Sequence, residues 1–328
     1  MRPGLLVACL GLAAVRAWAT EIAWPTSMDL RSIRSGADYL QPTVSGNPAS
    51  ATFGLVREEG LRFHEGVDIR PALLDGAGEP RDLIIAAMDG RVAYVDAAGR
   101  GGYGKYVVLV HPGAEVPVYT LYAHLARIDL ATRVGELVRR GQKLGVMGRT
   151  AEGANRIPPE RAHLHFEVGL VLSTGFNAWY DAQPDNWRTP NPHGQFNGQN
   201  LIGMDPLPVI AYPATNLLAA VRAQPTALTV ALRTTRVPDF VLRHPVLAQG
   251  EIRAAAGWYV EFSWQGMPVR WTALEASDPR LPAQGWQLRE LDPARRDLLV
   301  RRGMLAPDGR TPGDLLRQNV GILLSTAR

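Results

Sequence analysis

Short alternating segments between residues 83 and 172, each ended by glycine or proline, constrain the fold of this chain more than any other feature. The segment "LIIAAMDGRVAYVD" predicts two strands around an Asp-Gly turn, and "YGKYVVLVHPG" predicts a strand that ends at Pro112 and Gly113. "VPVYTLYAHL", "VGELVRRGQKLGVMG" and "AHLHFEVGLVL" add further short strands. Short strands at this spacing are typical of an antiparallel sandwich or barrel-like sheet, and the 33 glycines and 25 prolines agree with a mainly β fold.

The chain is long enough for two domains, because 328 residues with 46% hydrophobic content can bury a sizeable core. Residues 20–50 are predicted to be an irregular N-terminal segment, and residues 51–205 are predicted to form the antiparallel β domain. Within that domain, residues 173–204 are polar and rich in asparagine, proline and glycine, which predicts a long loop or a domain edge.

Residues 206–328 predict a small α+β domain of unknown role. "ALTVALRTT" resembles a strand, and "GWYVEFSWQGMPVRWTAL" predicts a hairpin that turns near Gln265 and Gly266. Two helices are expected near the end of the chain, one capped at Asp292 and one at Thr311, with Asp314 in the first turn of the second.

Residues 1–19 are predicted to be an export signal. They begin with Arg2, continue with an apolar run that is too short to span a bilayer, and end in an Ala-Trp-Ala cleavage site. An uncleaved N-terminal anchor is the alternative; after cleavage, no stable membrane insertion is expected. The mature chain would lack the only cysteine, Cys9, and so would have no disulfide or reactive thiol.

The overall charge gives no argument for a nucleic-acid partner. The formal net charge is +4, and loss of Arg2 and Arg16 with the signal leaves 33 basic and 31 acidic residues, a net charge of +2. No heptad run is present, and the sequence predicts no oligomeric state.

Two sequence segments place metal-ligand residue types close together. In "RFHEGVDIR", His64 and Asp68 are four residues apart, and Gly66 with its β-branched neighbours favours a loop that runs into a strand. The pair can converge if the chain turns at Gly66. His124 in "YAHL" lies near a strand end, where a lone histidine is usually structural.

The second of these segments, "RAHLHFEVG", alternates like a strand and places His163, His165 and Glu167 on one face. Residues i and i+2 on a strand have Cα atoms about 6.5–7 Å apart. That spacing suits one imidazole that binds a metal and a second that reaches the metal's water, with a solvated strand face as the alternative. Glu167 is predicted either to orient an imidazole or to be a carboxylate at the surface edge of the sheet.

These residues together predict a hydrolytic metal site. Two neutral imidazoles and one carboxylate are a common zinc set that leaves a fourth position for water, whose pKa the metal lowers towards neutrality. Further histidines can take the water's proton or stabilise an oxyanion. Without cysteine, the metal must be held by nitrogen and oxygen, which favours an open catalytic site over a structural one.

The order of "FGLVREEGLRFHEGVDI", "YGKYVVLVHPG", "YAHL", "VRRGQKLGVMGRT" and "AHLHFEVG" resembles that of the lysostaphin-type (LytM-like) zinc metallopeptidases over residues 50–170. The resemblance implies that His64, Asp68 and His165 hold one Zn²⁺ ion per chain. It implies catalytic roles for His124 and His163, as general base and oxyanion stabiliser, without settling which residue does which. It also implies an antiparallel β-sheet with a groove, of the duplicated hybrid motif type.

Members of that family are bacterial and mostly cut peptide cross-links or bridges in peptidoglycan, so the resemblance implies an exported endopeptidase with a peptidoglycan peptide as substrate. The export signal favours the periplasm or cell envelope over full secretion. Two alternatives stay open: a catalytically silent relative that activates a cell-wall amidase, and an exported metallopeptidase that acts on protein.

One segment departs from the family pattern. "RTAEGANRIPPERAHLH" is longer than usual before the histidine pair, and this loop is expected to line the groove and affect substrate choice. The remaining histidines receive no firm chemistry: His111 is predicted to be a turn residue, His193 lies in the polar loop where an approach to the groove is possible, and His244 is assigned no role. Core packing is expected, with sugar stacking as the alternative, for three tryptophans: Trp258, Trp264 and Trp271.

Overall fold

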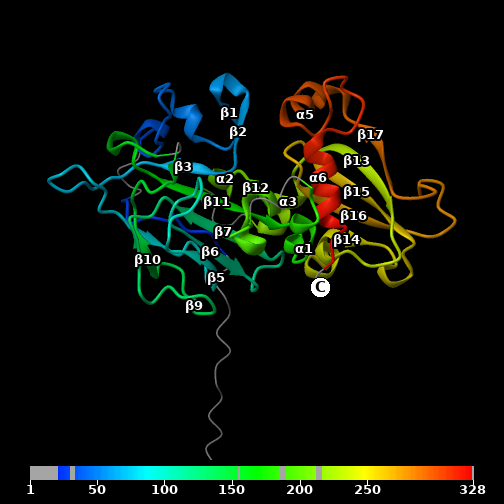
Figure 1. The fold of residues 1–328 in the computed structure, drawn as a ribbon, viewed down its shortest axis with the longest axis horizontal. Helices are drawn as coiled ribbons and strands as arrows, with labels where there is room; N and C mark the ends of the chain where they lie inside the picture. The colour runs from blue at the N-terminus through cyan, green and yellow to red at the C-terminus, as the bar shows by residue number, and fades with distance from the viewer. Residues whose placement is uncertain (1–20, 30–33, 154–155, 185–189, 212–215, 327–328) are drawn as a thin grey trace, which may run out of the picture.

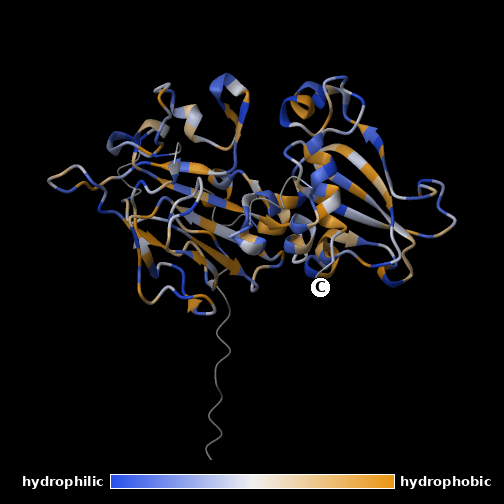
Figure 2. Ribbon diagram, in the orientation of Figure 1, coloured by the Kyte–Doolittle hydropathy of each residue, from blue (hydrophilic) through white to orange (hydrophobic). Residues whose placement is uncertain are grey.

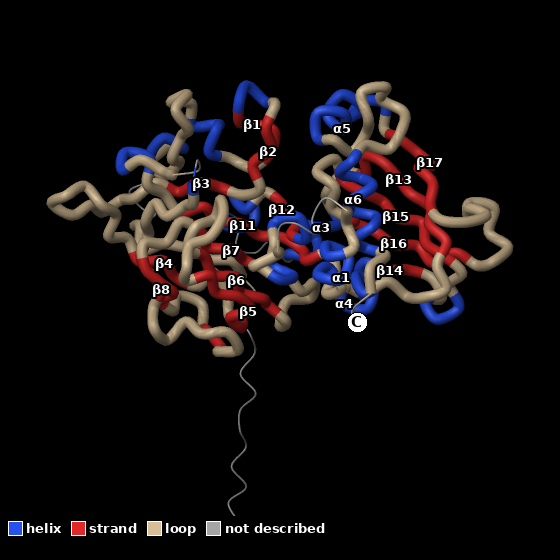
Figure 3. Tube along the Cα trace, in the orientation of Figure 1, coloured by secondary structure: helices blue, strands red, loops and turns tan. Residues whose placement is uncertain are grey.

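The computed structural model describes residues 21–29, 34–153, 156–184, 190–211 and 216–326, so the predicted export signal lies outside the described residues. Two β-sheets lie along the long axis of the molecule, with helices between them (Figure 1). Figure 3 shows the same arrangement by secondary structure, with strands concentrated towards the two sides. Within the described ranges, no helix has the length and apolar character needed to cross a membrane.

The larger sheet confirms the prediction of a mainly β fold with antiparallel strands. Six strands follow one another in the order β12-β11-β7-β6-β5-β9, and β3 pairs with β11 as the seventh; every pairing is antiparallel. The strands are β3 (Val67–Ile69), β5 (Gly90–Asp96), β6 (Tyr106–His111), β7 (Val118–Ala123), β9 (Leu137–Val138), β11 (Leu164–Val171) and β12 (Leu201–Met204).

Both faces of this sheet are buried, which explains why its central strands contain so few polar residues. Leu164, Phe166 and Val168 of β11 point into the main core, whereas Tyr106 and Tyr119 belong to a second apolar cluster on the opposite face. Figure 2 shows the apolar colour running along these strands. Polar side chains on a sheet that is covered on both sides are buried as well, and that condition determines the environment of His165 and Glu167.

Smaller strand groups flank the large sheet. β4 (Leu83–Ile85), β10 (Lys143–Val146) and β8 (Arg127–Ile128) form a three-stranded sheet, and β1 (Gly54–Arg57) pairs with β2 (Arg62–His64) as a hairpin. The two strands predicted around the Asp-Gly turn are present, but β4 and β5 belong to different sheets. Gly90 is required there because a Cβ atom would lie 2.8 Å from the Val110 carbonyl oxygen.

For residues 173–204, the prediction offered a long loop or a domain edge, and the long loop is wrong for two segments. Helix α1 (Phe176–Asp181) and strand β12 form there, and β12 pairs with β11 at the edge of the sheet. The buried amide of Asn200 joins them, since its Nδ2 donates to the Ser173 carbonyl and its Oδ1 accepts from the Ser173 N–H. The polar composition of residues 173–204 therefore did not indicate that part of this segment is buried and hydrogen-bonded.

Residues 206–326 contain the second sheet, in the order β14-β16-β15-β13-β17, which is antiparallel except for β14 with β16. Its strands are β13 (Thr226–Arg233), β14 (Ala248–Gln249), β15 (Gly257–Ser263), β16 (Pro268–Leu274) and β17 (Trp286–Leu291). The hairpin predicted near Gln265 and Gly266 is the β15–β16 connection. The helices are α2 (Pro206–Ala211), α3 (Leu217–Arg222), α4 (Asp239–Arg243), α5 (Arg296–Arg302) and α6 (Asp314–Leu323).

The two predicted late helices form, but only one has the expected cap. Asp292 accepts a hydrogen bond from the Ala294 N–H in the turn before α5. Thr311 instead donates its hydroxyl to Asp308, and Gly313 precedes α6 without a side-chain cap. Asp314 lies in the first turn of α6 as predicted.

One apolar core runs through both halves of the molecule. Helix α1 contacts α6, α2 contacts β11, and α3 contacts β16. The same contiguous cluster of buried residues includes Phe166 of the larger sheet and both Trp258 and Trp271 of the smaller one. Trp258 and Trp271 are fully buried, so they pack the core as predicted and present no surface to a sugar.

Candidate functional site

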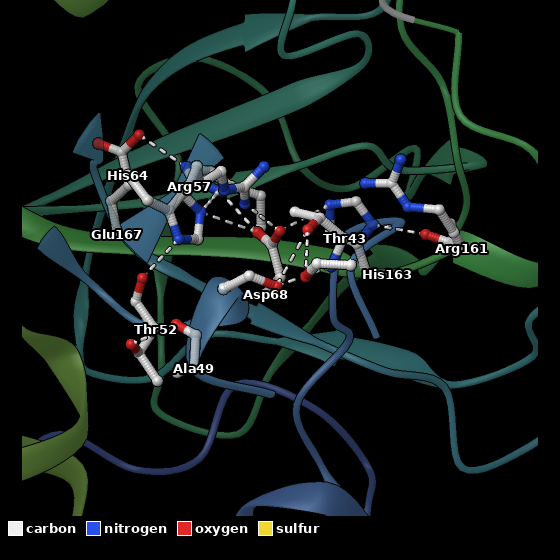
Figure 4. Close-up of polar contacts among 12 residues, drawn as sticks. Thr43, Ala49, Thr52, Arg57, His64, Asp68, Arg161, His163 and Glu167 are labelled. Atoms are coloured by element: carbon white, nitrogen blue, oxygen red, sulfur yellow. Dashed lines mark hydrogen bonds and ion pairs between the residues drawn. The ribbon is translucent and has the colours of Figure 1, made fainter. Parts of the chain in front are cut away.

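The predicted site residues surround one cavity of about 550 Å³ beside the larger sheet. Its lining includes all five: His64, Asp68, His124, His163 and His165. These side chains come from the end of β2, from β3, from the end of β7, and from β11 with the loop before it. Figure 4 shows how His64, Asp68 and His163 lie relative to one another.

Strand pairing brings Asp68 and His165 together. Asp68 of β3 lies opposite His165 of β11 in the antiparallel register, and on its other side His165 lies opposite Ala123 of β7. His64 joins them because the chain turns between β2 and β3 at Gly66, where a Cβ atom would lie 2.2 Å from the Phe166 carbonyl oxygen. The chain therefore turns at Gly66, and His64 and Asp68 converge as the sequence analysis allowed.

Three ligand-type atoms meet at the centre of this group. Nε2 of His64 lies 3.0 Å from Oδ1 of Asp68 and 3.0 Å from Nδ1 of His165, and Nδ1 of His165 lies 3.0 Å from the same Asp68 oxygen. All three residues are buried, with exposed fractions of 2%, 1% and 6%. Within the described residues they form the group of histidine and carboxylate side chains able to hold a metal ion.

Hydrogen bonds at the far side of each ring determine which nitrogen carries a proton. Nδ1 of His64 lies 2.8 Å from the Thr52 carbonyl oxygen, which can only accept, so Nδ1 donates and Nε2 keeps its lone pair. Nε2 of His165 lies 2.9 Å from Oε1 of Glu167 and donates to it, so Nδ1 is the ring nitrogen that faces Asp68 and His64. Two imidazole nitrogens and a carboxylate oxygen therefore face one another, and a cation is what such a donor set accommodates.

The charge state of Asp68 favours a cation. Burial alone would raise the pKa of Asp68, but its imidazole neighbours His163, His64 and His165 hold that pKa well below its usual value. The guanidinium of Arg57 forms an ion pair with Oδ2 of Asp68, which leaves Oδ1 facing the two histidines. Arg57 thus orients the carboxylate, a role that no pattern in the sequence indicated.

Glu167 is a buried carboxylate rather than a surface one. Besides His165, it accepts hydrogen bonds from the hydroxyls of Tyr103 (2.6 Å) and Tyr119 (2.7 Å), and its exposed fraction is 1%. Burial raises the pKa of both tyrosines well above the usual value, so both remain donors. Burial also lowers the pKa of His165, but hydrogen bonds to Asp68 and Glu167 outweigh it and raise that pKa to about 10. Glu167 therefore orients His165 and makes it more basic.

His124 and His163 form the second pair of imidazoles, next to the first. Their ring centroids are 4.7 Å apart, and Nδ1 of each ring faces a backbone carbonyl, that of Thr150 for His124 (2.9 Å) and that of Arg161 for His163 (2.7 Å). Both Nε2 atoms therefore keep their lone pairs. Nε2 of His163 lies 3.5 Å from Oδ2 of Asp68.

Both imidazoles of this pair are held neutral and in fixed positions. Burial lowers the pKa of His124 well below its usual value, with a further contribution from the neighbouring imidazoles of His163 and His165. Burial also lowers the pKa of His163, against the opposing charge of Asp68. His124 adopts a left-handed backbone conformation (φ 62°), which is uncommon for a residue other than glycine and is frequent at functional sites.

The other three histidines lie away from the cavity. His111 is fully buried and bonded to the Asp89 carbonyl and the Thr120 hydroxyl, so it is a core residue rather than a turn residue. His193 lies against Asp96 and the Tyr94 and Tyr106 rings, and it does not line the groove. His244 is buried against Phe240 in the second half of the chain.

Comparison with known proteins assigns the region that contains the site. Residues 62–175 match the sequence profile of Peptidase family M23. "Murein hydrolase activator NlpD" of Escherichia coli (strain K12) is 35% identical over 95 residues, which cover 29% of this chain and 22% of that protein. "Lipoprotein NlpD" of Yersinia enterocolitica is 33% identical over 94 residues, which cover 29% of this chain and 84% of that protein. The chain thus spans about a fifth of the length of the Escherichia coli relative.

Among solved structures, the catalytic domain of the antimicrobial peptidase lysostaphin from Staphylococcus simulans gives a TM-score of 0.30 at 20% identity. The likeness covers 49% of this chain and 87% of that one.

Proposed function

This chain belongs to Peptidase family M23, and from that membership we propose that it is a zinc-dependent endopeptidase that hydrolyses peptide bonds in peptidoglycan cross-links. The family consists of metallopeptidases, and the cavity contains a donor set suited to zinc. The predicted export signal supports action in the periplasm or elsewhere in the cell envelope. The observation that carries the proposal is the convergence of three ligand-type atoms beside two neutral imidazoles.

In this proposal His64, Asp68 and His165 hold the metal through Nε2, Oδ1 and Nδ1, respectively. A bound zinc ion supplies Lewis acidity, which lowers the pKa of a coordinated water towards neutrality and polarises a carbonyl. Arg57 and Glu167 keep the carboxylate and one imidazole in the required orientation from behind.

His124 and His163 would then perform proton transfer and charge stabilisation. Each has an Nε2 lone pair, because its Nδ1 proton is committed to a backbone carbonyl. A neutral imidazole with a free lone pair can accept the proton of the attacking water, and once protonated it can donate to the leaving amine. The second imidazole is available to stabilise the oxyanion.

Digestion of isolated sacculi tests this proposal. The purified full chain should release cross-link cleavage products that mass spectrometry identifies, and either chelation or His165→Ala should abolish the release. His193→Gln is a matched control outside the cavity and should keep the activity. Release that persists after chelation or in His165→Ala would contradict the mechanism.

The similarity to murein hydrolase activators supports a second candidate, in which the chain stimulates a cell-wall amidase without turnover of its own. In that case sacculi alone would remain intact, whereas addition of a partner amidase would reveal stimulation that survives His163→Ala. A peptide containing D-amino acids, compared with an all-L peptide, separates a peptidoglycan substrate from a protein substrate.

A further inference from the structure

The loop that departs from the usual family pattern forms one wall of the cavity. Between Gly148 and His163 the structure describes residues 149–153 and 156–162, and the cavity lining includes Arg156, Ile157 and Arg161 of this loop. The expectation that the loop lines the groove is thus met by the described part of the loop.

The base of this loop is anchored. The Arg149 guanidinium forms a bidentate ion pair with Glu79 (2.8–3.1 Å) and also donates to the Ile157 carbonyl oxygen at 3.2 Å. Three residues after Arg149, the Glu152 carboxylate accepts a hydrogen bond from the Gly101 N–H at 2.6 Å. The wall is therefore held at a defined distance from the metal-ligand residues.

The charged side chains around the cavity are mostly cationic. Four arginines line it, against two carboxylates, Glu65 and Asp68. Arg57 is neutralised by Asp68, and Arg62 pairs with Glu58.

The other two arginines of the lining, Arg156 and Arg161, form no ion pair with any described residue. Nε of Arg161 is buried and has no hydrogen-bond partner among the described residues. A buried guanidinium N–H without an acceptor is costly, and a ligand oxygen would relieve that cost.

We propose that Arg156 and Arg161 bind a free carboxylate of the peptide, so that the site selects anionic peptides with a carboxylate close to the scissile bond. A planar guanidinium matches a carboxylate through paired N–H donors, and such charge-assisted bonds are stronger than neutral ones. The statement that the carboxylate lies close to a scissile bond rests on the proposed peptidase function, whereas the binding of a carboxylate by the two arginines does not. The carboxylate can come from the peptide's C-terminus or from an acidic side chain.

Isothermal titration calorimetry with three synthetic peptides distinguishes these sources. The peptides share one D-alanine-containing cross-link sequence and carry free carboxylates, a C-terminal carboxamide or a side-chain carboxamide. We expect one of the carboxamides to weaken binding to the full chain by about tenfold to a hundredfold, and the affected peptide identifies the carboxylate that is bound.

Variants assign the effect to the loop. Arg156→Gln and Arg161→Gln should each reduce the preference for the carboxylate peptide, whereas Arg161→Lys should keep part of it because the charge remains. Arg253→Gln is the matched control, since Arg253 is exposed and outside the cavity. Binding of all three peptides within twofold of one another, or an unchanged preference in both glutamine variants, would overturn the proposal.

Hydrolysis of the same peptides separates this inference from the proposed function. Cleavage without a carboxylate preference would overturn the role of the two arginines and keep the peptidase. Preferential binding without cleavage would keep the arginine site and overturn the peptidase.

Discussion

Replacing Glu167 with glutamine removes a negative charge from behind His165 while retaining the volume of the side chain. Oε1 of Glu167 accepts hydrogen bonds from Nε2 of His165 (2.9 Å) and from the Tyr103 hydroxyl (2.6 Å), and Oε2 accepts from the Tyr119 hydroxyl (2.7 Å). A carboxamide oxygen in place of Oε1 can accept the first two bonds, and its NH₂ group can donate to the Tyr119 oxygen. We therefore expect the free energy of unfolding to change by only about 1 kcal/mol.

Zinc affinity should respond much more strongly than stability. The Glu167 carboxylate lies against one ring nitrogen of His165 and stabilises positive charge bound at the other. Loss of such a partner typically weakens metal binding by about 10-fold to 100-fold, or about 1.4–2.7 kcal/mol. Glu167→Gln should also weaken zinc binding if zinc must displace a proton from His165. Exchange of one proton for Zn²⁺ still adds one net positive charge to the site, and the Glu167 carboxylate stabilises that charge.

Competition with a fluorescent zinc chelator near neutral pH measures this effect on the dissociation constant. Glu261→Gln provides a matched control, because Glu261 is hydrogen-bonded to Thr226 and Arg270 in the second sheet, away from the cavity. Urea unfolding shows whether each variant is folded. Zinc affinity in folded Glu167→Gln equal to that of the wild type would refute the view that Glu167 makes His165 a stronger ligand.

His165→Ala should lose zinc because it removes a ligand-type nitrogen, whereas His163→Ala should keep zinc and lose hydrolysis; metal analysis that shows equal loss in both variants would contradict this division. Burial lowers the pKa of His111 to about 4, so the unfolded chain binds a proton first as pH falls below 6.5, and stability should decrease by about 3 kcal/mol between pH 6.5 and 4. His111→Gln should show a shallower pH dependence in urea unfolding, and an unchanged slope would contradict this. Trp264→Ala should lower the free energy of unfolding by about 2–3 kcal/mol and weaken zinc binding, because Trp264 packs on Phe63, the neighbour of the proposed ligand His64. Normal zinc affinity and unchanged hydrogen exchange in residues 54–64 would argue against a link between Trp264 and the site.

The strands of the larger sheet could be predicted because alternation and glycine punctuation are local properties of the sequence. The role of Glu167 could not be decided from the same alternation. A strand with polar residues on one face is compatible with a solvated face, and only the pairing of β11 with β7 brings Tyr119 against Glu167. Whether a polar strand face is solvated or buried depends on segments that are distant in the sequence.

The helices show a second limit of sequence reasoning. The two late helices were recognised from their acidic residues and prolines, but α1 to α4 contain only five or six residues each. Fewer than two turns do not produce a readable 3.6-residue period, and such helices form because neighbouring elements bury them. The acceptors that determine the histidine protons, such as the Thr52 and Thr150 carbonyls, are backbone atoms and leave no mark on the sequence.

Strand β2 links the second half of the chain to the candidate site. His64 and its neighbour Phe63 both line the cavity. The Phe63 ring also lies against Trp264 (ring centroids 5.6 Å apart) and beneath the guanidinium of Arg302, 3.8 Å from the ring centroid. Burial lowers the pKa of Arg302 to about 10, partly offset by the charge of Glu65. Removal of residues 206–328 would therefore expose Phe63 and release the hairpin that carries His64, so zinc binding has to be measured on the full chain.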